Sequence, residues 1–115
     1  LYLKREGYRV KQIQIYCDLE KRRYVCYVET SGKPLMVTEQ MEYEVNASLA
    51  KKFQFYGMRI YQQHIMRPMI LVSMRNGWQD FLYAQKLKPG ISLSQIKLPI
   101  LIQEPIDACW FDVND

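Results

Sequence analysis

The segment YRVKQIQIYCDLEKRRYVCYVE, residues 8–29, decides the fold, because it has the pattern of two strands joined by a tight turn. Residues 8–17 and 23–29 are rich in β-branched and aromatic side chains, and a short polar interruption separates them. If the turn falls at Glu20-Lys21, Ile15 faces Cys26 in an antiparallel hairpin and Cys17 faces Tyr24. The more apolar face, which we expect to lie on the core, then carries Ile13, Ile15, Cys17, Tyr24, Cys26 and Val28.

This register has a consequence for the cysteines. Cys17 and Cys26 lie diagonally across the hairpin, with Cβ atoms about 7 Å apart, whereas a disulfide needs about 4 Å. We therefore predict no bond between them. The chain has three cysteines and one histidine, His64, without C-x-x-C spacing, so it lacks the pattern of a structural zinc site. Free, buried thiols in an intracellular, reducing compartment are expected.

The middle of the chain contains two competing patterns. Met41, Tyr43 and Val45 alternate with polar residues as in a strand, whereas Met41, Val45 and Leu49 have helical spacing. Dividing the segment satisfies both patterns, with a strand to Val45 and a helix over residues 47–56. Asn46 or Ser48 would cap this helix and Gly57 would end it.

Further strands are predicted at residues 35–38, 58–66, 69–74, 91–98 and 109–113, with 69–74 as a central strand. The sum is an α+β, mainly β fold: an antiparallel open barrel, or pseudobarrel, of about seven strands with one or two short helices.

The length of 115 residues suits a single domain, 1–115, with an N-terminal hairpin in residues 1–33 and an acidic C-terminal segment in 98–115. The chain does not begin with Met, which favours a piece of a longer protein. No apolar run approaches the roughly 20 residues that span a bilayer, so no membrane partner is expected.

Few residues point to catalysis. His64 lies in a strand-like segment without a neighbouring nucleophile, and no phosphate-binding or dinucleotide-binding loop is present in the sequence. Asp107 and Asp112 flank Trp110, but two acids at such spacing do not by themselves define a glycosidase pair. We therefore expect a non-enzymatic protein without metal or cofactor.

The charge distribution favours binding to a polyanion. The net charge is +4 although residues 98–115 carry four acids and no base, so the remainder is more strongly basic. Bases, aromatic residues and glutamines also alternate over residues 59–67. Such side chains can neutralise phosphates, stack on bases and read base edges.

A spaced motif in residues 76–90 adds a family resemblance. Its residues Gly77, Trp78, Phe81, Leu82, Leu87 and Gly90 form the pattern G-W-x-x-F-L-x-x-x-x-L-x-x-G, which resembles the hallmark of the plant B-three DNA-binding domain. The residues themselves predict a turn at Gly77 with positive φ, then a short amphipathic helix. Trp78, Phe81 and Leu87 are expected in the core.

The resemblance implies a pseudobarrel that binds double-stranded DNA and regulates transcription in the nucleus. Phosphate contacts would come from Lys51, Lys52, Arg59, Arg67 and Arg75, and base contacts from Gln62, Gln63 and Asn76. The alternative is a protein-interaction or assembly domain that binds a protein partner or forms a homo-oligomer without nucleic acid.

Overall fold

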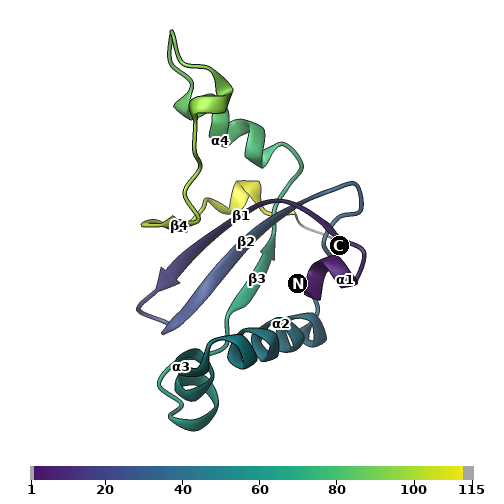
Figure 1. Ribbon diagram of the computed structural model, residues 1–115, viewed down its shortest axis with the longest axis vertical. Coiled ribbons are helices and arrows are strands. Elements are labelled where there is room, and N and C mark those ends of the chain that lie inside the picture. The colour runs from purple at the N-terminus through teal and green to yellow at the C-terminus, as the bar shows by residue number, and fades with distance from the viewer. Residues whose placement is uncertain (1, 113–115) are drawn as a thin grey trace.

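The hairpin forms the centre of a four-stranded mixed sheet in the computed structural model, which describes residues 2–112. Strands β1 (Arg9–Asp18) and β2 (Arg23–Ser31) pair antiparallel. Strand β3 (Ile70–Ser73) runs parallel to β2, and the two-residue β4 (Leu101–Ile102) runs parallel to β1. The strand order is therefore β3-β2-β1-β4 (Figure 1).

The predicted register of the hairpin is confirmed. Ile15 pairs with Cys26 and Cys17 with Tyr24, and all three cysteines are free thiols. Cys26 is buried, but Cys17 and Cys109 are exposed, so the prediction of buried thiols is right only for Cys26.

The predicted seven-strand antiparallel barrel is wrong. Residues 2–112 contain four strands in one open sheet, two of the three strand pairings are parallel, and four α-helices accompany the sheet. Much of the predicted strand content is helical or irregular. The largest difference is α2 (Glu39–Lys52), because the segment up to Val45 that was predicted as a strand is part of this helix.

Helix α2 begins eight residues before the predicted start, because the residues that favour a helix N-terminus lie upstream of Asn46. The Thr38 hydroxyl accepts a hydrogen bond from the Met41 N–H at 3.1 Å, so Thr38 is the cap, not Asn46 or Ser48. Acids lie in the first turn and Lys51 and Lys52 in the last, which suits the helix dipole. These local signals outweigh the alternation over residues 41–45.

Gly57 does not end the helical region. The chain continues from α3 (Gln54–Gly57) into a π-helical turn, η1 (Met58–Gln62), where a strand was predicted. Gly57 is instead required for close packing, because a Cβ atom at this position would lie 2.9 Å from the Cβ of Ala50.

Helices lie on both faces of the sheet. On one face, α1 (Tyr2–Arg5) and α2 surround a core of Leu3, Cys26, Val28, Leu35, Met41, Met69 and Leu71. On the other, α4 (Trp78–Lys86) and the C-terminal segment cover Val25, Tyr27 and Met74. Figure 1 shows α2 and α4 on opposite sides of the sheet, so the architecture is a layered α/β arrangement.

Strand β3 is an edge strand, not the predicted central one, and its outer edge is hydrogen-bonded to other parts of the chain. The buried Asn46 side chain donates to the Met69 carbonyl and accepts from the Met69 N–H, both at 2.8 Å. Glu42 Oε2 accepts from the Leu71 N–H at 2.7 Å. Further along, the Asp112 N–H donates to the Ser73 carbonyl at 2.8 Å.

The motif of residues 76–90 forms the predicted helix. Gly77 has φ of 102°, and α4 follows with Trp78 only 1% exposed. Phe81 and Leu87 are 39% and 51% exposed, so their predicted place in the core is wrong, although the Phe81 ring packs on Trp110.

The C-terminal part holds less strand than predicted. Residues 91–98 contain only a 3-10 turn, η2 (Leu93–Gln95), and a second such turn, η3 (Ala108–Trp110), occupies part of the predicted strand 109–113. Phe111 forms an isolated bridge with Met74, and Val113 lies outside the described residues. No helix within residues 2–112 is both long and apolar enough to cross a membrane.

Candidate functional site

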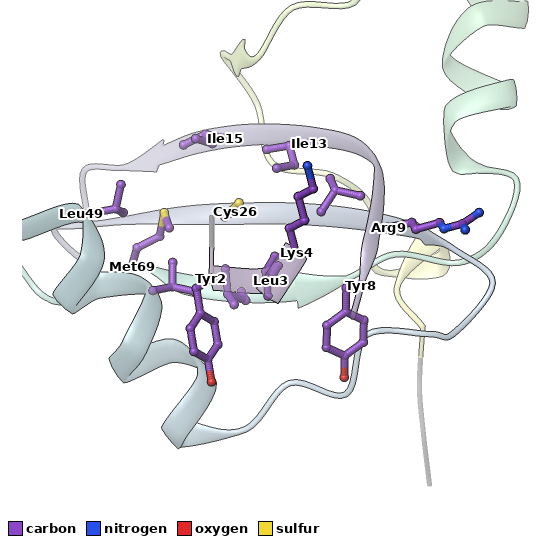
Figure 2. Close-up of a pocket in the computed structure, with 13 residues that line it drawn as sticks. Tyr2, Leu3, Lys4, Tyr8, Arg9, Ile13, Ile15, Cys26, Leu49 and Met69 are labelled. Atoms are coloured by element: carbon purple, nitrogen blue, oxygen red, sulfur yellow. The ribbon is translucent and has the colours of Figure 1, made fainter. Parts of the chain in front are cut away.

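An apolar cavity of about 560 Å³ lies on the face of the sheet that carries α1 and α2. The hairpin strands form its floor, and α1, α2 and the start of β3 form its walls. Figure 2 shows side chains from these elements around the space, among them Leu3, Ile13, Ile15, Leu49 and Met69.

The lining has little chemical functionality. Its charged members, Lys4 and Arg9, are both exposed, and none of the described residues that line the cavity is acidic. Burial raises the pKa of the Cys26 thiol to about 12, so this group remains protonated and is a poor nucleophile at neutral pH. The cavity is therefore suited to receive apolar surface, not to perform acid–base or nucleophilic chemistry.

A buried carboxylate, Glu29, lies on the opposite face and is fully engaged. Its two oxygens accept hydrogen bonds from the Gly77 N–H at 3.1 Å and the Gln79 N–H at 2.6 Å, at the start of α4. Lys11 Nζ lies 3.5 Å from Oε2. Glu29 thus caps α4 from a neighbouring strand and neutralises a lysine, which is a structural role.

The remaining candidates for catalysis do not come together. Asp107 accepts a hydrogen bond from the Cys109 N–H, which lowers the pKa of its carboxyl group, and it does not line the cavity; nor does Asp112. His64 is exposed and has a φ of 54°. Within the described chain, no three His, Cys, Asp or Glu side chains form a group that could hold a metal ion.

The residues predicted to contact nucleic acid are all exposed but fall into two groups. Six of them follow or end α2 and precede β3: Lys51, Lys52, Arg59, Gln62, Gln63 and Arg67. Arg75 and Asn76 lie two and three residues after the other end of β3, where the Arg75 guanidinium donates to the Cys109 carbonyl at 3.0 Å. None of the eight lines the apolar cavity.

Sequence reasoning placed Ile13, Ile15 and Cys26 on the core face but missed that this face is partly open. The missed wall is α1, for which no helix was predicted. A signal was present, because Gly7 follows Tyr2–Arg5 at the position where glycine commonly ends a helix.

Comparison with known families corrects the predicted identity. Residues 7–106 match the model of the GH3 family C-terminal domain. No curated protein matches the chain. The match overturns the resemblance to the plant B-three domain, and with it the predictions of DNA binding, transcription regulation and a double-stranded DNA partner. Because this match covers most of its length, the chain is a member of the family of GH3 C-terminal domains.

Proposed function

We propose that this chain is a single, non-catalytic accessory domain of a longer GH3-family polypeptide. Its proposed function is to pack the open apolar face of its sheet against another part of that polypeptide. The description of the family as a C-terminal domain supports a preceding part. The observation that carries the proposal is the apolar cavity, whose described lining contains no acid.

The expected energy of such packing is substantial. Ile13, Ile15, Val45 and Leu49 line the cavity and are only half-buried in this chain. Complete burial of one such side chain contributes about 1.5–3 kcal/mol relative to full exposure. Covering these four half-buried side chains therefore contributes several kcal/mol, which is a large fraction of the free energy of unfolding of a small domain.

The packing is tested by the accessibility of the cavity in the parent polypeptide. Leu49→Cys places a thiol in the lining, and the adjacent Ser48→Cys places a matched thiol on the exposed surface of α2. Mass spectrometry of the two labelled peptides should show that the thiol of Leu49→Cys is labelled at least about tenfold more slowly than the thiol of Ser48→Cys. Equal rates in the parent would refute the proposal.

The absence of a catalytic role is tested separately. In the parent polypeptide, Asp107→Asn combined with Asp112→Asn should leave kcat within about twofold of the native value, because neither acid lines the cavity. A loss of about a hundredfold or more with unchanged folding would show that this domain contributes catalytic groups.

An intracellular location also remains a proposal. The exposed free thiols of Cys17 and Cys109 support a reducing compartment, since exposed thiols are oxidised readily elsewhere. Fractionation of cells that produce the parent polypeptide tests it.

A further inference from the structure

A second pocket, of about 370 Å³, lies at the start of β3 and is called the edge pocket below. Helix α2, the π-helical turn η1, the segment that enters β3 and the first residue of β2 all contribute to its lining. Its volume is sufficient for a small molecule. Unlike the apolar cavity, it is lined by ionisable side chains of both signs: Arg23, Arg67, Glu39, Glu42, Tyr43 and Tyr61.

The two arginines of the edge pocket come from distant parts of the chain. Arg23 is the first residue of β2, and Arg67 lies three residues before β3. The Arg67 N–H donates to the Arg22 carbonyl at 2.8 Å, so the backbone holds the two segments side by side. Arg22 has a φ of 54°, a conformation that is uncommon for a residue other than glycine. The fold thus brings two guanidinium groups to one pocket.

The fold itself does not use either guanidinium group. Among residues 2–112, neither Arg23 nor Arg67 forms an ion pair, and neither side chain donates a hydrogen bond to the protein. Nevertheless Arg23 Nε is buried, and it has no acceptor among these residues. Buried donors without an acceptor are rare in native proteins, because the N–H has lost its bonds to water. An acceptor that enters the pocket would satisfy this N–H.

The two glutamates of the edge pocket do not neutralise the arginines. Glu42 Oε2 accepts a hydrogen bond from the Leu71 N–H at 2.7 Å, so this carboxylate is held at the edge of β3. Glu39 is the first residue of α2 and is exposed, so water and salt screen its charge. Both acids lower the affinity for an anion, and both offer acceptors to hydroxyl groups on the same ligand.

The two tyrosines add donors to the pocket. Burial, together with the neighbouring Tyr43, raises the pKa of the Tyr61 hydroxyl, so this group is protonated at neutral pH and can donate a hydrogen bond. The Tyr43 side chain comes from α2 and that of Tyr61 from η1, so the two hydroxyls belong to different walls.

We propose that the edge pocket binds the oxyanion group of a small molecule, carboxylate or phosphate, through the guanidinium groups of Arg23 and Arg67. Arginine suits this role because its planar fork donates two parallel hydrogen bonds to two oxygens of one oxyanion. Arg23 Nε and the adjacent terminal nitrogen form one such fork. This site is independent of the proposed packing of the apolar face.

The charges favour a single oxyanion over an extended polyanion. Of the eight residues predicted to contact nucleic acid, Arg67 alone lines the edge pocket. The carboxylates of Glu39 and Glu42 in the same lining would repel a second negative group on the ligand.

Nuclear magnetic resonance of the full-length protein, labelled with 15N-arginine, tests the site. The Arg23 Nε–H signal, assigned by its loss in Arg23→Lys, should shift saturably as inorganic phosphate or acetate replaces chloride at constant ionic strength. We expect half of the shift at about 1–10 mM anion. Arg67→Gln should weaken binding at least about fivefold, because charge-assisted hydrogen bonds are lost. The matched control Arg59→Gln, an exposed residue outside the lining, should change it less than about twofold.

Each outcome bears on the proposal. Saturation with phosphate but not acetate would support a phosphate ester as the ligand, and the reverse would support a carboxylate. If neither anion moves the Arg23 Nε–H signal up to about 50 mM, the inference is wrong. It is also wrong if the signals of Arg23 and Arg59 shift in parallel without saturation, or if Arg59→Gln weakens binding as much as Arg67→Gln does.

Discussion

Replacing Glu29 by alanine should lower the free energy of unfolding by about 3–5 kcal/mol, chiefly because two backbone N–H groups lose their acceptor. The carboxylate is fully buried and accepts from two backbone N–H groups at the start of α4. Each N–H left without a partner costs about 1–3 kcal/mol. Lys11 also loses its counter-charge at 3.5 Å. Because small domains have a total stability of about 5–15 kcal/mol, the loss is large.

Urea unfolding followed by tryptophan fluorescence measures this loss, since Trp78 is the first residue of α4. With a slope of about 1–3 kcal/mol per molar urea, the midpoint should fall by at least about 1 M. Lys11→Met is the matched control. It removes the ion pair and keeps both hydrogen bonds of Glu29. Because the Lys11 side chain is 28% exposed, this change should cost less than Glu29→Ala, about 1–2 kcal/mol. A loss below about 1 kcal/mol for Glu29→Ala, or equal losses for both variants, would refute this account of α4.

Three further changes test the packing of the domain. Asn46→Ala should cost about 2–4 kcal/mol in urea unfolding, because it leaves buried backbone groups of the β3 edge without partners. Gly57→Ala should cost about 1–3 kcal/mol, since its Cβ would lie 2.9 Å from that of Ala50, and Ala50→Gly in the same chain should restore most of the loss. Burial raises the Cys26 pKa from 9.0 to about 12, so the neutral thiol is the form that folding favours. The contribution of this neutral thiol to the stability of the folded domain is complete below pH 9 and is lost as the pH rises toward 12. Cys26→Ala should flatten the fall of stability above pH 9 in urea titrations, and the exposed Cys17→Ala should not.

What could be predicted from the sequence was set by contacts between near neighbours in the chain. The hairpin register and the helix after Gly77 follow from alternation, turn residues and helical spacing, all within about 20 residues. The floor of the cavity, with Ile13, Ile15 and Cys26, was predicted for the same reason. The fold class was not, because the alternation of residues 41–45 also suits a helix capped at Thr38.

The rest depends on contacts between distant residues. Glu29 caps α4 from 48 residues away, and no local pattern marks that partnership. The parallel pairings of β3 with β2 and of β4 with β1 likewise bring together segments far apart in the chain. That the cavity remains open depends on how α1 and α2 share one face of the sheet. Local spacing does not specify that arrangement.

The bonds from α2 to the edge of β3 also bear on solubility. An unpaired strand edge can add a strand from a second molecule, which is the first step of β-aggregation. At Met69, the Asn46 amide offers one donor and one acceptor, the same pair that a peptide group of an incoming strand would offer. A helix side chain therefore substitutes for a neighbouring strand and blocks intermolecular pairing at that point. Removing Asn46 should thus promote association between molecules even under conditions where the domain remains folded.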